Sequence, residues 1–299
     1  MPTHRDATCS QQQLTQAHLQ FSLLDAIYFM NPVEAYIAQY TGKTIAVAVT
    51  DLETDKSIYI NADKSFHPAS TMKVPVMMEV FHQASQGLFS LDTHVEIINS
   101  FTSIADGSSY SLDIKDDSET SLYARIGESE SLHELTRLMI VRSSNLATNL
   151  LIEKVGAKRV NVYLQKLGIQ GVTIARGVED KAAFRLGMNN SATARGLTQM
   201  MTLIAEGKVV SKEASQQMIE IMLGQEFNES IPALLPKSVK VAHKTGWTGE
   251  FYHDTGIVFP EDRKPYAISI LTRGFPENNE DEAHNCMATI SKMIYEQIM

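Results

Sequence analysis

The strand-like segments of this chain lie near its two ends, and helix-like segments fill the long stretch between them. Residues 44–52 and 57–61 alternate apolar with small or polar residues around a polar turn, which predicts a two-stranded hairpin. Three more strand-like segments occur at 239–243, 255–259 and 266–272. A lone hairpin is only marginally stable, so each group needs partners. We therefore expect both groups to share one antiparallel sheet, in a fold of the α/β (α+β) class.

Apolar residues at helical spacing mark the segments between the two strand groups. These segments are 70–86, 131–141, 145–155, 157–167, 192–206 and 212–223. Helices are also expected near the chain ends, at 14–30, 33–40 and 282–298. We predict that the terminal helices pack on the sheet and that the middle helices form an inserted all-α lobe.

The same pattern predicts the boundaries of the lobes. Residues 1–12 read as a flexible tail. The sheet lobe comprises 13–69 and 224–299, and the all-α lobe comprises 70–223, including a loop at 176–190. A chain of 299 residues can bury a sizeable core in this arrangement. We expect the two lobes to form one catalytic unit.

Composition argues against several classes of partner. With 35 acidic and 26 basic residues, the net charge of −9 disfavours binding to nucleic acid or anionic lipid. No apolar run is long enough to predict a membrane span. Cys9, Cys286 and the nine scattered histidines match neither a disulfide framework nor a metal motif, so no metal or other cofactor is expected. The N-terminus lacks the pattern of an export signal, which predicts either a cytoplasmic protein or a leader outside this chain.

A loop-like stretch at 101–130 is rich in acidic residues. It carries Asp106, Asp113, Asp116, Asp117 and Glu119, without the spacing of a calcium loop. We interpret it as a solvated surface segment. Its position between two of the motifs described next leaves open a second interpretation, in which Tyr110 contacts the rim of a cleft.

The first of three short motifs is Ser70-Thr71-Met72-Lys73. Ser70 begins an expected helix, where unpaired backbone N–H groups favour negative charge, and Lys73 lies one turn later on the same face. A serine hydroxyl needs a base, and a lysine whose pKa is lowered by burial and a nearby cation can act as one. Alternatively, Ser70 caps the helix and Lys73 is solvated.

The second motif, Ser143-Ser144-Asn145, opens the helix expected at 145–155. Ser and Asn are preferred N-cap residues, which explains the motif without a function. We expect one residue to cap the helix while Ser143 and Asn145 point into a cleft. Ser143 could then pass a proton to a leaving nitrogen, and Asn145 could bind a substrate amide.

The third motif, Lys244-Thr245-Gly246, follows the strand expected at 239–243. Lys244 and Thr245 suit a substrate carboxylate, and Gly246 lets a substrate lie close to the strand. The backbone N–H of Trp247 could pair with that of Ser70 as an oxyanion hole. Taken alone, Lys-Thr-Gly is only a strand end; the order of the three motifs is what makes it informative.

This ordered set resembles the motifs of the class A serine β-lactamases and their penicillin-binding relatives, from about Val33 to the C-terminus. The resemblance implies a β-lactamase/transpeptidase-like fold: an antiparallel sheet flanked by terminal helices, an inserted all-α lobe, and an active site between the lobes. Carried over by position, it assigns roles to these residues: Ser70 as the acylated nucleophile, Lys73 as its base partner, Ser143 and Asn145 as the second motif, and Lys244 and Thr245 as the third.

Two departures from the family pattern bear on activity. Ser144 stands where the family usually has Asp, so a structural carboxylate is missing. In the loop, the family reads Arg-x-Glu-x-x-Leu-Asn, whereas here Arg176 is followed by Glu179, and Ala183 replaces the Asn. We expect Glu179 to be the base that activates the deacylating water, with a surface carboxylate as the alternative, and Asn190 to partner Arg176 in place of the usual acid.

The function implied is a hydrolase that opens β-lactam rings through a Ser70 acyl-enzyme, with slow deacylation expected because the loop is altered. Two alternatives stay open: a peptidoglycan D,D-peptidase or small-ester hydrolase of the same fold, and a penicillin-binding sensor that does not turn over. The expected partner is a small molecule, a β-lactam or a D-Ala-D-Ala-like peptide, acting on a monomer. By resemblance, the location is periplasmic or secreted.

Overall fold

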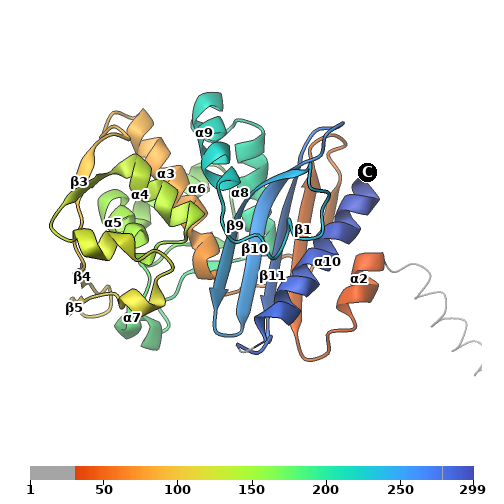
Figure 1. Cartoon of the computed structure of the whole chain (residues 1–299), viewed down its shortest axis with the longest axis horizontal. Helices are drawn as coiled ribbons and strands as arrows, with labels where there is room; N and C mark the ends of the chain where they lie inside the picture. The colour runs from red at the N-terminus through yellow and green to blue at the C-terminus, as the bar shows by residue number, and fades with distance from the viewer. Residues whose placement is uncertain (1–30, 278) are drawn as a thin grey trace, which may run out of the picture. The chain divides into compact units, whose positions relative to one another are not determined.

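Strands from the two ends of the chain form one five-stranded sheet in the order β2-β1-β11-β10-β9, as seen in a computed structural model (Figure 1). The bounds are Thr44–Asp51 for β1, Ser57–Ile60 for β2, Lys240–Thr248 for β9, Phe251–Phe259 for β10 and Tyr266–Arg273 for β11. Strand β1 pairs antiparallel with β11 along its whole length, from Thr44 opposite Arg273 to Asp51 opposite Tyr266. The predicted fold class, with one antiparallel sheet built from both chain ends, is confirmed.

The structure describes residues 31–277 and 279–299, and the chain divides into two compact units, 1–41 and 42–299. The expected tail at 1–12, the helix at 14–30 and Cys9 lie outside the described residues. Of the first unit, the structure describes helix α2 (Pro32–Ile37), which begins where the Asn31 side chain accepts a hydrogen bond from the Val33 N–H at 3.0 Å. The remaining description concerns the second unit.

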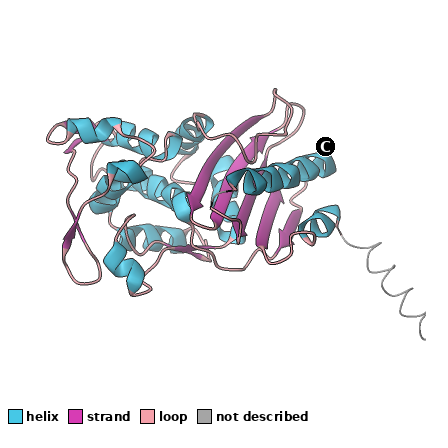
Figure 2. Ribbon diagram, turned by 60° about the horizontal axis from the view of Figure 1, so that its bottom comes forward, coloured by secondary structure: helices cyan, strands magenta, loops and turns pink. Residues whose placement is uncertain are grey.

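Two helices cover the two faces of the sheet (Figures 1 and 2). Helix α10 (Glu280–Ile298) packs against β10 on one face, and α8 (Ala194–Ala205) packs against β1, β10 and β11 on the other. Helix α8 lies within the segment that we assign to the all-α lobe, yet it packs against three strands of the sheet as well as against α9. The lobe boundary at residue 223 therefore stays a prediction. Helix α8, which comes from the segment 70–223, covers one face of the sheet.

Helices and short strands make up the rest of the second unit. The helices are α3 (Lys73–Ser85), α4 (Leu132–Val141), α5 (Asn145–Val155), α6 (Ala157–Lys166), α7 (Lys181–Arg185) and α9 (Lys212–Leu223). The 3₁₀ turns are η1 (Ala69–Met72), η2 (Ile114–Asp116) and η3 (Ser121–Arg125). The short strands pair as β3 (His94–Glu96) with β6 (Ser129–Ser131), β4 (Phe101–Thr102) with β5 (Ser109–Tyr110), and β7 (Val172–Thr173) with β8 (Ser191–Ala192).

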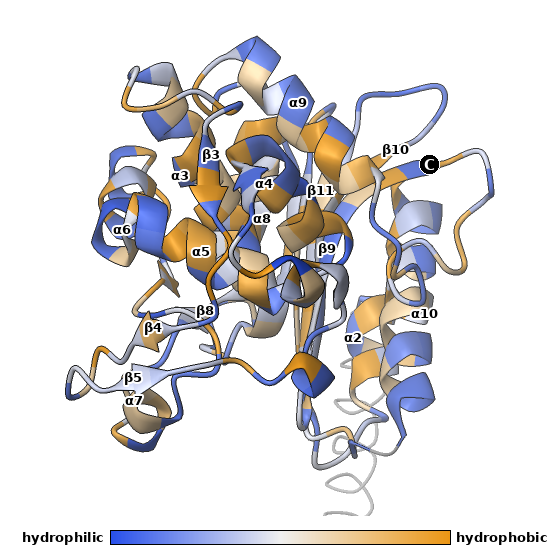
Figure 3. Ribbon diagram, turned by 60° about the vertical axis from the view of Figure 1, so that its left-hand side comes forward, coloured by the Kyte–Doolittle hydropathy of each residue, from blue (hydrophilic) through white to orange (hydrophobic). Residues whose placement is uncertain are grey.

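Helix α3 is the centre of the helical layer. It contacts α4, α5, α6 and α9, and every residue from Lys73 to Phe81 is buried. Figure 3 shows its hydrophobic residues lying among those of α4 and α5. A helix buried on all sides carries any side chain at its first turn into the interior. Lys73, the first residue of α3, is therefore enclosed by the fold.

Several boundaries differ from the sequence prediction. The helix expected from Ser70 begins at Lys73, and Ser70 lies on the preceding 3₁₀ turn η1. Strands β9 and β10 extend well beyond 239–243 and 255–259, since they continue pairing up to Thr248 opposite Phe251. The added strand residues include buried His, Lys and Asp side chains, which break the apolar pattern that reveals a strand.

All helices within the described ranges are too short or too polar to span a bilayer.

Candidate active site

Ser70 lies where the 3₁₀ turn η1 meets the edge strand β9. A Cβ atom added to Gly246 of β9 would lie 2.8 Å from the Ser70 backbone nitrogen and 3.0 Å from that of Thr71. Only glycine therefore allows the strand to approach the turn this closely. Ala69, just before Ser70, has a φ of 45°, a strained value for a residue with a side chain. The Ser70 hydroxyl is half-buried and makes no hydrogen bond to any residue that the structure describes.

Lys73 is fully buried and points toward the second motif. Its Nζ donates to the Ser143 carbonyl oxygen at 2.5 Å, to the Ser143 Oγ at 3.2 Å and to the Asn145 Oδ1 at 2.9 Å. Burial lowers the pKa of Lys73 to about 7, although the charges of Asp117 and Glu179 act in the opposite direction. Three donated bonds belong to the ammonium form, and a pKa near neutrality lets the same amine lose a proton and become an acceptor near pH 7.

In the second motif, one residue caps the following helix and two face Lys73. Ser144 caps α5, because its Oγ accepts a hydrogen bond from the Ala147 N–H at 3.1 Å. Ser143 has a φ of 57°, and this turn directs both its hydroxyl and its carbonyl at Lys73. Asn145, the first residue of α5, also faces Lys73. The strained backbone at Ser143 marks a position held by its surroundings.

Lys244 of β9 completes a pair of buried lysines around one hydroxyl. Its Nζ donates to the Ser143 Oγ at 3.0 Å and to the Thr245 carbonyl oxygen at 2.9 Å. Burial, together with the charge of Lys73, holds the pKa of Lys244 well below its usual range. A hydroxyl oxygen accepts at two lone pairs and donates one hydrogen. With both lysines donating to it, the Ser143 hydroxyl is left with its own proton to give.

The other residues of the third motif line the free edge of the sheet. Thr245 is half-buried, Gly246 is buried against η1, and Trp247 is 52% exposed. Strand β9 bonds to β10 on one side only, so its second backbone edge faces η1. The motif thus brings unpaired strand backbone next to Ser70.

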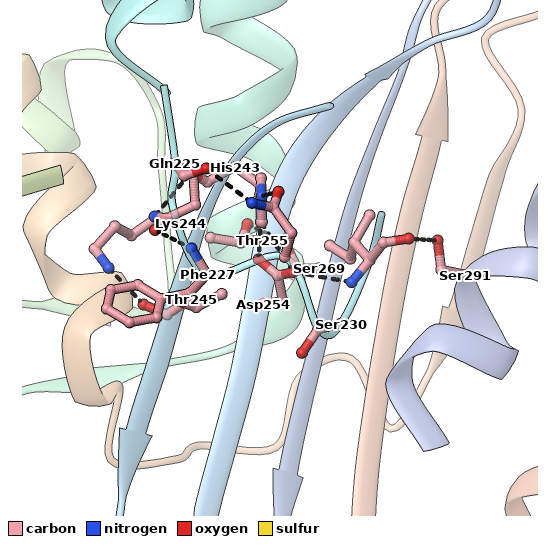
Figure 4. A network of polar contacts seen from close by, with 12 residues as sticks. Gln225, Phe227, Ser230, His243, Lys244, Thr245, Asp254, Thr255, Ser269 and Ser291 are labelled. Carbon is pink, nitrogen blue, oxygen red and sulfur yellow. Dashed lines mark hydrogen bonds and ion pairs between the residues drawn. The ribbon is translucent and has the colours of Figure 1, made fainter. Parts of the chain in front are cut away.

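Behind the strand, a buried polar network fixes β9 to its neighbours (Figure 4). The His243 Nδ1 lies 2.9 Å from Asp254 Oδ1, and Asp254 Oδ2 accepts from the Ile231 N–H at 3.0 Å. His253 is also buried, with its ring nitrogens bonded to the backbone oxygens of Tyr252 and His67. Burial lowers the pKa of His253 to about 4, so it is neutral. Both histidines therefore make hydrogen bonds within the core.

Glu179 reaches the same site from the loop before α7. Its Oε1 accepts a hydrogen bond from the Asn145 Nδ2 at 3.1 Å, and its Oε2 accepts from the Asp113 N–H at 3.3 Å. Burial raises the pKa of the Glu179 carboxyl. Its φ of 60° is a third strained value beside the site. The Asn145 amide thus links Lys73 and Glu179, one on each side.

The remaining hydrogen of the Asn145 amide is also taken. Asn145 Nδ2 donates to the Asp116 carbonyl oxygen at 3.1 Å as well as to Glu179. A primary amide nitrogen has two hydrogens. A bond from Asn145 Nδ2 to a substrate carbonyl oxygen therefore requires one of these two bonds, to Asp116 or to Glu179, to break.

Sequence reasoning missed the residues that hold the Glu179 loop. The Asn149 side chain accepts from the Val178 N–H at 2.7 Å and donates to the Val178 carbonyl oxygen at 3.1 Å. Asp180 accepts from Ser103 Oγ at 2.8 Å and from the Ala183 N–H at 2.9 Å. The four-residue spacing of Asn145 and Asn149, which puts both amides on one face of α5, was the available signal.

The arginine of the loop has a different partner from the one expected. Arg176 donates from its guanidinium to Asn189 Oδ1 at 2.9 Å and to the backbone oxygens of Gly177 and Met188. Asn190 instead accepts from the backbone N–H of Arg176 at 3.0 Å. The expectation that Asn190 pairs with the guanidinium was wrong, because its side chain bonds to the loop backbone.

The acidic segment is also less solvated than expected. Asp117 and Glu119 are buried, and Asp117 accepts from backbone N–H groups at the start of α5. Interpreting the whole run as a surface loop was wrong for these two residues. Tyr110 is half-buried and its hydroxyl lies 3.4 Å from the Val178 carbonyl oxygen, beside the loop.

Within residues 31–277 and 279–299, no group of three or more His, Cys, Asp or Glu side chains could hold a metal ion.

Comparison with known proteins assigns the chain to a family. A family model described as the β-lactamase enzyme family matches residues 29–298. The extended-spectrum β-lactamase PER-1 of Pseudomonas aeruginosa is 25% identical over 249 residues, covering 79% of this chain and 77% of that protein.

Two solved structures share the fold. A β-lactamase from Sphaerobacter thermophilus has a TM-score of 0.76 and 22% identity, covering 89% of this chain and 95% of that one. A mutant of PBP-A, solved as an acyl-enzyme complex with penicillin G, has a TM-score of 0.74 and 22% identity, covering 99% and 98%. Since the family match extends over almost the whole sequence, including all three motifs and the Glu179 loop, the chain belongs to the β-lactamase enzyme family.

Proposed function

We propose that this protein hydrolyses β-lactams through a covalent acyl-enzyme on Ser70. The observation that carries the proposal is the Ser143 hydroxyl held by two buried lysines, 3.2 Å from Lys73 and 3.0 Å from Lys244. Buried lysines with lowered pKa values are costly, and such groups cluster at functional sites.

In the first step, the Ser70 oxygen attacks the β-lactam carbonyl carbon. Neutral Lys73, one turn later on the chain, takes the hydroxyl proton. The backbone N–H groups of Ser70 and Trp247 are the proposed donors to the developing oxyanion, since β9 and η1 approach each other at Gly246. Fixed donors of this kind stabilise charge that is present only in the transition state.

Collapse of the tetrahedral intermediate breaks the bond between the carbonyl carbon and the ring nitrogen. The nitrogen needs a proton, and Ser143 is placed to donate one, because both of its acceptor positions face lysines. The proton is replaced through Lys73. Lys244 and Thr245 are the proposed partners of the substrate carboxylate, a group that also compensates the charge of the lysine pair.

The second step releases the acyl group by hydrolysis. Glu179, with its raised pKa and its hydrogen bond to Asn145, is the proposed base that takes a proton from water. Its position favours turnover. A permanent adduct would instead suit a sensor. The acyl-enzyme described for the PBP-A mutant is the kind of intermediate that this mechanism requires. A monomeric state and a periplasmic or secreted location stay predictions.

Intact mass spectrometry after mixing with benzylpenicillin tests the proposal. We expect a transient increase equal to the mass of benzylpenicillin, followed by return to the parent mass. Ser70→Ala should fold normally and give no adduct. An adduct that persists would favour the D,D-peptidase or sensor alternatives, and an adduct on Ser70→Ala would refute the nucleophile.

A further inference from the structure

We propose that Asp117 is a positioning residue of the active site, which supplies from a distant loop the carboxylate that the second motif lacks. The inference rests on the proposed function, because its effect is on acylation of Ser70. The motif has Ser144 at the place where the resemblance predicts an acid. Asp117 precedes that position by a long stretch of chain and follows the short turn η2.

The Asp117 carboxylate is bonded mainly to the start of α5. Its Oδ2 accepts from the backbone N–H groups of Asn145 and Leu146, both at 2.9 Å, and from the Tyr123 hydroxyl at 3.0 Å. The Ser144 Oγ lies 3.5 Å from the same oxygen. Asp117 is 7% exposed, so little water reaches its carboxylate. These donors and the positive end of the helix compensate its charge instead.

Fixing the start of α5 fixes the groups that hold Lys73. Asn145 donates its backbone N–H to Asp117 and uses its side chain to accept from the Lys73 ammonium. Ser143, two residues before α5 proper, accepts from the same amine. Asp117 therefore sets the direction from which both motif residues reach Lys73, without touching the substrate itself.

Asp117 also acts on Lys73 through its charge. The charged groups that face Lys73 are Asp117 beside α5, Glu179 on the loop and Lys244 on β9. Asp117 and Glu179 both raise the pKa of Lys73 against the effect of burial. Loss of the Asp117 charge would lower that pKa further, which a purely structural cap would not do.

The test compares acylation rates of Asp117→Asn and the parent with benzylpenicillin across pH 5.5–8.5. We expect acylation to slow by about tenfold or more, because displaced reacting groups lose near-attack geometry. We also expect the acid limb of the rate profile to move to lower pH. Asp92→Asn, an exposed aspartate before β3, is the matched control and should keep both the rate and the limb.

A second variant moves the carboxylate to the place where the resemblance predicts it. Asp117→Ser combined with Ser144→Asp should recover most of the acylation rate, because Asp at 144 can cap α5 as Ser144 does. If the parent is not acylated, the proposed function itself fails. If the parent is acylated and Asp117→Asn keeps its rate and its acid limb, the inference is overturned.

The remaining outcomes also decide the question. Asp117→Asn could be acylated slowly with an unmoved acid limb, and the double variant could fail to recover the rate. Asp117 would then only support the fold, and the inference would be overturned. If Asp117→Asn does not fold, recovery in a folded double variant supports the inference. Failure of both variants to fold, or a folded double variant that is not acylated, overturns it.

Discussion

At the scale of single residues, the proposed mechanism depends on one amine being neutral. Lys73 has its pKa lowered to about 7 by burial, and it must lose its proton before it can accept one from Ser70. We therefore predict that the acylation rate of the parent rises with pH through a midpoint near 7. Stopped-flow measurement of acylation by a chromogenic cephalosporin gives this profile directly.

Variants of the two lysines distinguish proton acceptance by Lys73 from substrate binding by Lys244. Lys73→Met should slow acylation by several orders of magnitude and abolish the limb near pH 7, because the proton acceptor is gone. Lys244→Ala should chiefly weaken substrate binding, so KM should rise by a larger factor than kcat falls. Equal, small losses in both variants would argue against a site between the two lysines.

Glu179 is predicted to act only in the second step. Glu179→Gln should be acylated at close to the parent rate and should then accumulate acyl-enzyme, detected by intact mass. Deacylation by the parent should weaken as the pH falls through the raised pKa of Glu179, since the base becomes protonated.

The matched control for this variant has to be an exposed carboxylate. Glu128→Gln serves, because the Glu128 side chain is 63% exposed. Neighbouring Asp180 does not serve, because it is buried and holds the loop. Rapid turnover that survives in Glu179→Gln would assign the base to another group.

At the scale of elements, the segment 113–117 is predicted to restrict which substrates enter. The Asp116 carbonyl occupies an Asn145 hydrogen that a substrate acylamino group would otherwise use. We expect β-lactams without an acylamino side chain to acylate Ser70 faster than benzylpenicillin, because they do not require the bond from Asn145 to the Asp116 carbonyl to break. Competition between the two classes for Ser70, followed by mass spectrometry, measures the preference. A faster reaction of benzylpenicillin would show that this bond does not restrict the substrate.

The sequence predicted this site unevenly, for physical reasons. Ser70, Lys73, Ser143 and Lys244 were found because each stands in a short motif, and adjacency in sequence gives adjacency on a turn or strand. Asp117 was missed because its partners are on a helix that follows much later, and an acidic run looks solvated from composition alone. The ends of β9 and β10 were missed because buried polar residues interrupt the apolar alternation.

At the scale of the whole molecule, the buried lysines link stability to pH. Lys73 has an ordinary pKa of 10.5 in the unfolded chain and about 7 when folded. Between these values the unfolded state binds more protons, so the free energy of unfolding rises with pH, by at most about 1.4 kcal/mol per pH unit for one lysine. The penalty is full below pH 7 and disappears above the unfolded pKa.

Urea unfolding at pH 7 and pH 9 checks this linkage. The parent should gain more stability over this interval than Lys73→Met, in which one of the two buried amines is absent. Lys158→Met, at an exposed lysine, is the control and should follow the parent. An identical gain in the parent and in Lys73→Met would contradict the burial of a titrating amine.

The close approach of β9 to η1 has a consequence for the point in synthesis at which the protein can become active. Ser70 is synthesised early, but β9, the strand that lies against its turn, leaves the ribosome only after the whole helical insertion. Contacts so distant in sequence form slowly, because the entropy of closing the intervening chain is lost first. A nascent or truncated chain that contains Ser70 and lacks β9 should therefore not be acylated by penicillin. The time at which covalent labelling by penicillin begins would then report when β9 has folded against the Ser70 turn.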